Sequence, residues 1–354
     1  MDLTWFWTIL AQTTVEPALF FKTLGMNIEH GAPITNDLII DKMCQVELNY
    51  SEEICANLTK EGFENINIEV QQNVNNFWMI LEWMGNISAF VYSLFAGSLL
   101  DQFGCKPFLL VPAIGLVMSR VCLLLNFALI DILPIEFFYM INMYNFFGGN
   151  SVFYLGSYSY GALNFKPEDR SKALARYDGL ESAGEVLGNI LAPIILVNIG
   201  IYGNYGIASG CSILTLLYIL ICIPHKPSTR NSTRNFFMEF MISPIINMFK
   251  TLFKRRPQGL HWLIGIQIYA FGSYWFTLQE HSVRYLFMLK TFEGFDHVSM
   301  SWFNIYNTFA NLVGLLIIFP IMNDYFHIHD AAMLTIFVSC EALSKKTFSL
   351  SVQI

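Results

Sequence analysis

The sequence predicts an all-α polytopic membrane protein, and its composition and the pattern of its apolar residues support this prediction. Of its 354 residues, 54% are hydrophobic and 13% are charged, whereas a soluble domain carries about 25% charged residues. The apolar residues form long continuous runs, and a helix needs about 20 such residues to cross a bilayer. The runs do not alternate with polar residues, as the strands of a membrane barrel do. A lipid bilayer is therefore the expected surroundings of the chain.

Charge and cysteine content exclude several other classes. The formal net charge is −7, which argues against a nucleic-acid partner, because such proteins carry a basic patch. The seven cysteines include no CxxC pair and no Cys/His cluster, so we expect no metal site and no cofactor. No His-rich box or Ser/His/Asp set marks an enzyme. We therefore expect a membrane protein without enzymatic activity.

The apolar runs set the expected helices in order. We predict spans at about residues 5–25, 77–100, 108–129, 136–160, 178–200, 204–223, 260–285 and 299–321. A ninth begins near Ala331 and stops near Cys340, before a polar end that does not complete it.

Loop charges predict the orientation, since loops rich in Lys and Arg stay in the cytosol. Residues 161–177 and 224–259 are basic, and counting back from them places the N-terminus in the cytosol. The 26–76 loop is then outside, at the plasma membrane or an endolysosomal membrane.

The 26–76 loop carries two further signs of an outer location. It is acidic, and it holds glycosylation sequons at Asn49 and Asn57. Cys44 and Cys55 share the loop, and an oxidising compartment favours a disulfide between them. Two free thiols are the alternative.

A short polar knot joins the second and third spans. In GSLLDQFGCKP, we expect Gly97 to allow close helix packing and Gly104 to allow a sharp turn. Asp101 and Lys106 supply the charges. The knot resembles the signature loop of the major facilitator superfamily, Gly-x-x-x-Asp-x-x-Gly-Arg-Lys/Arg, which latches two half-bundles on the cytosolic side. Cys105 stands where the family has Arg, and a thiol cannot form the bidentate pair of a guanidinium.

More of the chain resembles a narrower group, the proton-coupled folate transporter family, which includes the thymic stromal cotransporters. The resemblance rests on the order of four motifs: Val15-Glu16-Pro17, Cys44…Asn49-Tyr50-Ser51…Cys55, the knot, and Glu168-Asp169-Arg170-Ser171. It implies twelve helices in two six-helix bundles around a central cavity, with alternating access.

Mapped onto that fold, the chain has about 9 of the 12 helices. Residues 1–223 form a complete N-terminal six-helix bundle, 224–259 form a basic cytosolic linker, and 260–354 form an incomplete C-terminal bundle. We therefore expect a chain truncated at its C-terminus.

Three acids open the fifth span at i, i+3 and i+7. This spacing puts Asp178, Glu181 and Glu185 on one helical face, and crowding favours a proton on one of them near neutral pH. The resemblance favours Asp178 as the proton-coupling acid, whereas depth favours Glu185, and both stay candidates. Asp178 and Glu181 at an interfacial helix N-terminus are the alternative. Gly184 and Gly188 form a GxxxG suited to tight packing.

Other ionisable residues at membrane depth are candidates as well, because such groups usually face a cavity or a partner. His261 begins the seventh span and matches a family histidine linked to proton handling; a structural role is the alternative. Substrate or cavity candidates are Glu16, Glu82, Arg120, Glu280 and Arg284. Glu82 is a possible partner of Arg120, and Glu280 a possible partner of Arg284.

These observations favour a solute carrier that moves a small organic anion, folate-like or a related conjugate, together with protons by alternating access. The alternative is a truncated, non-transporting membrane protein that acts as a regulator or receptor. Cys105 and the incomplete ninth span favour that alternative.

Overall fold

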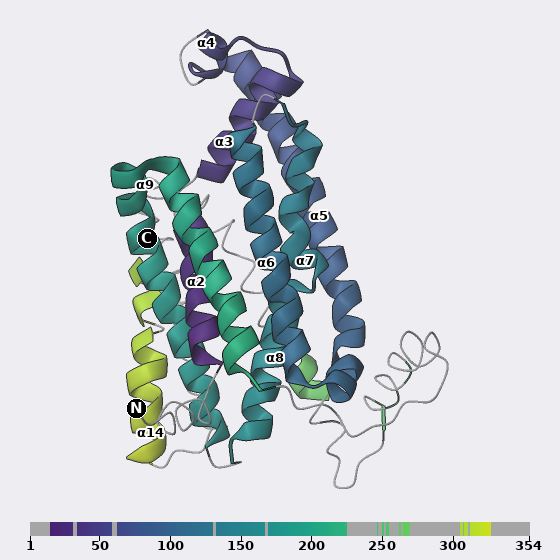
Figure 1. The fold of residues 1–354 in the computed structure, drawn as a ribbon, viewed down its shortest axis with the longest axis vertical. Helices are drawn as coiled ribbons and strands as arrows, with labels where there is room; N and C mark the ends of the chain where they lie inside the picture. Colours follow the sequence, from purple (N-terminus) through teal and green to yellow (C-terminus); the bar gives the residue numbers. More distant parts are fainter. Residues whose placement is uncertain are drawn as a thin grey trace, which may run out of the picture. The chain divides into compact units, whose positions relative to one another are not determined.

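The computed structural model describes most of the N-terminal two thirds of the chain and short stretches beyond. The described residues are 15–30, 34–58, 62–129, 132–166, 169–224, 246, 250, 253–254, 262, 265–269, 305–306, 308–310 and 312–326. Every regular element among them is a helix (Figure 1), as the sequence predicts. The chain divides into two compact units, Met1–Thr233 and Arg234–Ile354. The assignment of residues 224–259 to a cytosolic linker stays a prediction.

The described elements of the first unit form a helical bundle, and residues 34–58 form a helical cap on it. In order they are α2 (Glu16–His30), α3 (Ile34–Lys42), the π-helical turn η1 (Met43–Glu47), α4 (Glu52–Cys55), α5 (Glu64–Phe103), α6 (Cys105–Ala128), the 3₁₀ segment η2 (Ile135–Asn142), α7 (Met143–Phe146), α8 (Gly149–Asn164) and α9 (Arg170–Cys222). In the second unit, η5 (Gly314–Ile318) and α14 (Phe319–Asp324) cover the end of the predicted 299–321 span.

Three of the described helices are long and apolar enough to cross a membrane: Glu64–Gly97 within α5, α6, and α9. The 53-residue α9 is two consecutive helices, because Gly200 interrupts it with φ 79° and ψ −173°. A positive φ is accessible to glycine without strain. The break falls between the predicted spans 178–200 and 204–223.

The fourth predicted span, 136–160, is wrong as a single helix. It consists of η2, α7 and α8, and the chain turns at Gly148 (φ 98°) and Gly149 (φ 56°). The turn lies where α6 comes close: a Cβ at Gly115 would stand 2.9 Å from the carbonyl oxygen of Met143. The apolar run gave no sign of this interruption, because both glycines are compatible with a membrane helix.

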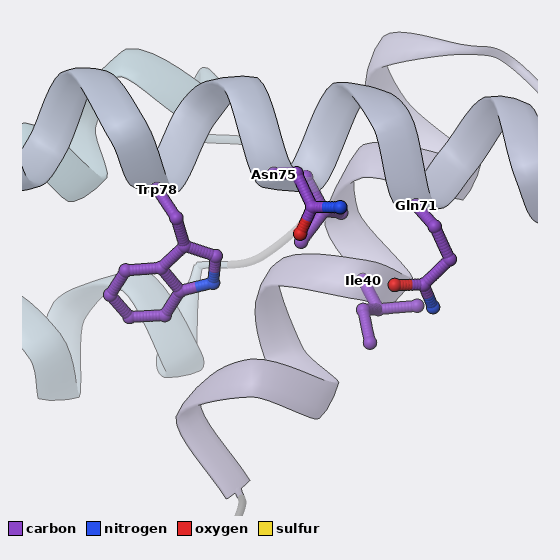
Figure 2. A pocket seen from close by; sticks show the side chains of 5 residues that line it. Ile40, Gln71, Asn75 and Trp78 are labelled. Atoms are coloured by element: carbon purple, nitrogen blue, oxygen red, sulfur yellow. The ribbon is translucent and has the colours of Figure 1, made fainter. Parts of the chain in front are cut away.

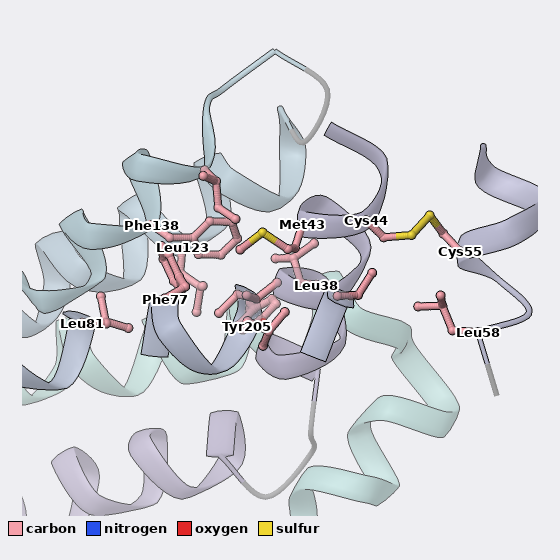
Figure 3. Packing of buried hydrophobic residues seen from close by; sticks show 14 residues of the cluster. Leu38, Met43, Cys44, Cys55, Leu58, Phe77, Leu81, Leu123, Phe138 and Tyr205 are labelled. Carbon is pink, nitrogen blue, oxygen red and sulfur yellow. A yellow bond between two sulfur atoms is a disulfide. The ribbon is translucent and has the colours of Figure 1, made fainter. Parts of the chain in front are cut away.

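The predicted outer loop, residues 26–76, is largely helical. It contains α3, η1 and α4, and α5 begins at Glu64 rather than at residue 77 (Figure 1). Its apolar side chains pack with those of α5, α6 and η2 around Phe77, Leu123 and Phe138 (Figure 3). The cap is thus continuous with the core of the bundle.

One disulfide and one hydrogen bond hold the helical cap in place. Cys44 and Cys55 form a disulfide (Figure 3). The hydroxyl of Tyr50 donates to Glu69 Oε2 at 2.8 Å, and this hydrogen bond to a carboxylate raises the pKa of Tyr50. The loop between the two cysteines is thereby fixed to α5.

α2 packs against both halves of α9, which lie beside it in Figure 1. A Cβ at Gly184 would stand 2.8 Å from the carbonyl oxygen of Phe20, and one at Gly188 would stand 2.9 Å from that of Leu24. On the second half of α9, Ala208 O would lie 3.0 Å from a Cβ at Gly25. The predicted tight packing at the GxxxG is therefore present, and its partner is the backbone of α2.

We expect Gly184→Ala and Gly188→Ala each to lower the thermal stability of the purified chain in detergent. Each added methyl group meets backbone that cannot rotate away, and overpacking costs about 1–3 kcal/mol. Gly206→Ala is the matched control, because a Cβ there meets nothing within 4 Å. Equal melting temperatures for all three variants would contradict the close packing of α2 on α9.

Candidate functional site

A buried lysine lies at the centre of a polar cluster between α2, α8 and α9. The side chain of Lys22 on α2 is 1% exposed. Its Nζ lies 3.1 Å from Glu181 Oε1 on α9 and 3.0 Å from Asn150 Oδ1 on α8. Since an unpaired buried ammonium is costly, these two oxygens define where Lys22 can lie.

Glu181 accepts three hydrogen bonds within this cluster. Its Oε1 accepts hydrogen bonds from Lys22, from Thr23 Oγ1 at 3.2 Å, and from the hydroxyl of Tyr154. Each donor requires a lone pair on the oxygen, so the arrangement suits an ionised carboxylate. Glu181 therefore has the contacts of a fixed negative charge that compensates Lys22.

Asp178 lies one turn before Glu181 and differs from it. Its Oδ1 accepts a hydrogen bond from the hydroxyl of Tyr158 at 2.6 Å. Within the described part of the chain, no basic side chain forms an ion pair with Asp178. The rings of Tyr154 and Tyr158 are stacked, with centroids 5.9 Å apart. Two stacked tyrosines of α8 thus hold two adjacent carboxylates of α9, of which only Glu181 is paired with a base.

A second buried ion pair joins α2 to α6. Arg120 pairs with Glu29, and both side chains are at most 5% exposed. The expected pairing of Arg120 with Glu82 is wrong, because Glu82 is exposed and accepts a hydrogen bond from Asn86 on its own helix. The partner of Arg120 is therefore Glu29 of α2 and not Glu82 of α5.

The remaining candidates are distributed over the unit or lie outside the described residues. Glu16 Oε1 lies 3.4 Å from Arg176 Nε, so it is paired at the start of α2. Glu185 is partly buried, one turn beyond Glu181. The predictions for His261, Glu280 and Arg284 fall outside the described residues.

The knot between α5 and α6 is a sharp turn at Gly104, with φ 77°. Lys106 Nζ donates to the carbonyl oxygen of Leu220 at 2.8 Å, near the end of α9. A Cβ at Gly97 meets no described atom within 4 Å, so the close packing expected there stays a prediction. The prediction for the Asp101 carboxylate lies outside the described side chains. Cys105 is buried in the apolar core beside α8 and α9.

The glycosylation candidates lie on the cap. Asn49 is exposed, with a left-handed φ of 55°, and Asn57 Nδ2 donates to the carbonyl oxygen of Glu53 at 2.7 Å. Their modification stays a prediction.

A pocket of about 420 Å³ lies between α3 and α5 (Figure 2). It is lined by Ile40, Gln71, Val74, Asn75 and Trp78. None of these side chains is charged, and neither helix contributes to the cluster around Lys22. Among the described residues no group of His, Cys, Asp or Glu could hold a metal ion.

Sequence reasoning missed Lys22 and Glu29, and with them the partners of Glu181 and Arg120. A usable signal was present for Lys22, an ionisable residue within the predicted span 5–25, where it requires a partner. Glu29 fell in the predicted outer loop, where a charge needs none. Asn150, Tyr154 and Tyr158 gave weaker signals, since polar and aromatic residues are common in membrane helices and carry no charge to be explained.

The model of the Major Facilitator Superfamily matches residues 80–342, well over half of the chain. No curated protein matches it. The match begins within α5, so α2 lies before it.

We expect Arg120→Met to destabilise the chain strongly, by about 3–5 kcal/mol, because it leaves the Glu29 carboxylate buried without its cation. The double variant Arg120→Met/Glu29→Met should recover much of that loss, since it removes both charges. Thermal unfolding of the purified variants measures the effect. The exposed Glu82→Gln is the control, with an expected change within about 0.5 kcal/mol. A double variant no more stable than Arg120→Met would contradict the pairing.

Proposed function

Because the chain belongs to the major facilitator superfamily, an integral-membrane family of solute transporters, we propose that it carries a small organic anion across the membrane together with a proton. The observation that carries the proposal is the pair of neighbouring carboxylates on α9 with unequal partners. Lys22 compensates Glu181, whereas among the described residues Asp178 contacts the hydroxyl of Tyr158 and no base.

A carboxylate at membrane depth is costly unless a cation or a proton neutralises it. Since no described base pairs with Asp178, a proton is the remaining means of neutralising it. Asp178 is also only partly buried, so the described residues do not enclose its carboxyl group. We therefore assign the proton to Asp178 first, and keep Glu185 and His261 as further proton-handling candidates.

Two arguments support an anionic substrate. A proton that travels with one negative charge moves no net charge across the bilayer, so the membrane potential does not oppose uptake. The ordered motifs that resemble the proton-coupled folate transporters also support a carboxylated, folate-like substrate. An acidified plasma-membrane surface or an endolysosomal membrane would supply the proton gradient.

We expect Asp178→Asn to reduce the acid-stimulated uptake of labelled folate by about tenfold, a loss of about 1.4 kcal/mol. Asparagine keeps the acceptor for Tyr158 but cannot take up a proton. The measurement compares uptake into proteoliposomes, with the full chain, in acidic and in neutral medium.

Glu82→Gln serves as the control, because it removes an exposed acid outside the cluster. Acid stimulation that is the same in the wild-type chain, Asp178→Asn and Glu82→Gln would contradict the role of Asp178. If acid stimulation is retained in Asp178→Asn and lost in Glu185→Gln, the proton-binding role belongs to Glu185.

A further inference from the structure

The proton step proposed at Asp178 does not use the buried ammonium of Lys22. We propose that Lys22 is the anchor for an aryl carboxylate, which replaces Glu181 at the ammonium while Glu181 takes up a proton. This inference rests on the proposed function and adds to it the substrate class, the binding residue and the order of events.

The surroundings of Lys22 match an anion that carries an aromatic ring. Its Nζ lies 4.4 Å from the ring centroid of Tyr154 and 5.2 Å from that of Phe153. The two oxygens that it contacts belong to Glu181 and Asn150. A carboxylate bound to the ammonium would therefore lie beside an aromatic wall, which Tyr158 extends by stacking on Tyr154.

The ammonium of Lys22 is less accessible than the groups that it contacts. Lys22 is 1% exposed and Glu181 is 17% exposed, and Asn150 is an exposed residue of α8. Glu181 and Asn150 are thus more accessible than the ammonium that they contact. A substrate carboxylate that binds the ammonium would have to take the place of one of these oxygens.

Repulsion between like charges prevents a substrate anion from simply replacing ionised Glu181 at the ammonium. If an anion displaced ionised Glu181, the site would hold two carboxylates and one ammonium, and a buried charge would lose its partner. A proton on Glu181 removes this obstacle, because the neutral carboxyl group still accepts from Thr23 and Tyr154. Substrate and proton therefore enter together.

The groups that face Glu181 determine how it takes up the proton. They are Lys22 and Thr23 from α2, Tyr154 and Tyr158 from α8, Tyr144 from α7, and Asp178 and Glu185 on α9 itself. Of these, Lys22 is the cation, and its departure to the substrate makes a proton on Glu181 more favourable. Asp178, one turn away, supplies the proton that it has bound.

The balance of the step is simple. One proton passes from Asp178 to Glu181, and Asp178 takes up another from the solution; the Lys22 ammonium keeps its three protons; and the substrate carboxylate stays ionised. No covalent bond other than O–H is made or broken. The neutral pair Lys22–Glu181 becomes the neutral pair Lys22–substrate beside a neutral acid, so the site gains one anion and one proton.

Benzoate is the probe, because it contains only a carboxylate and an aromatic ring. The full chain in lipid nanodiscs is titrated with ¹³C-carboxyl benzoate in weak buffer, and NMR reports binding while a pH dye reports proton uptake. For the wild-type chain we expect one proton taken up for each benzoate bound. Absence of benzoate binding, or binding without proton uptake, would overturn the proposal.

Two variants separate the anchor from the proton acceptor. Glu181→Gln frees the ammonium, so it should bind benzoate about tenfold more tightly than the wild-type chain does, without proton uptake. Lys22→Gln/Glu181→Gln keeps the hydrogen bonds between neutral groups and should abolish binding. Unchanged affinity in the double variant, relative to Glu181→Gln, would overturn the role of Lys22.

Failure here and failure of the proposed function give different results. If benzoate does not bind but Asp178→Asn still loses acid-stimulated folate uptake, the chain remains a proton-coupled carrier whose anion is held elsewhere. If benzoate binds as expected but uptake does not depend on Asp178, the anchor stands and the entry of the proton must be reassigned.

Discussion

The close contact between α2 and α9 is the constraint on which the polar interior of the bundle depends. Gly184 and Gly188 let the backbone of α2 approach until carbonyl oxygens fill the places of missing side chains. At that separation the ammonium of Lys22 reaches Glu181, which lies one turn before Gly184. A larger residue at either glycine would move the helix that carries the cation away from the acid that compensates it.

α2 carries charges of both signs toward different neighbours. Lys22 contacts α8 and α9, and Glu29, two turns later, pairs with Arg120 of α6. Because the surrounding lipid offers no solvation, each of these charges fixes the relative position of two helices as well as being stabilised by it. The ion pairs therefore specify where α2 lies as much as they contribute to stability.

Much of the architecture could be predicted from the sequence, because the helices coincide with long apolar runs whose length the bilayer sets. The all-helical class could be predicted in this way, whereas the turn at Gly104 and the GxxxG packing were predicted from the properties of glycine. The interruption at Gly148 and Gly149 could not, since it depends on how closely α6 approaches the segment. The partner of Arg120 could not be chosen either, because sequence spacing does not tell which helix faces it across the bundle.

The candidate site shows the same division between local and distant information. The face shared by Asp178 and Glu181 is a local property, and helical periodicity was enough to predict it. The difference between the two acids is a property of the tertiary structure: a lysine far earlier in the chain reaches Glu181, and a tyrosine reaches Asp178. Two carboxylates one turn apart thus have different partners, one a buried base and one a hydroxyl group. In the proposed mechanism this difference matters, because the acid without a cation is the one that binds the proton first.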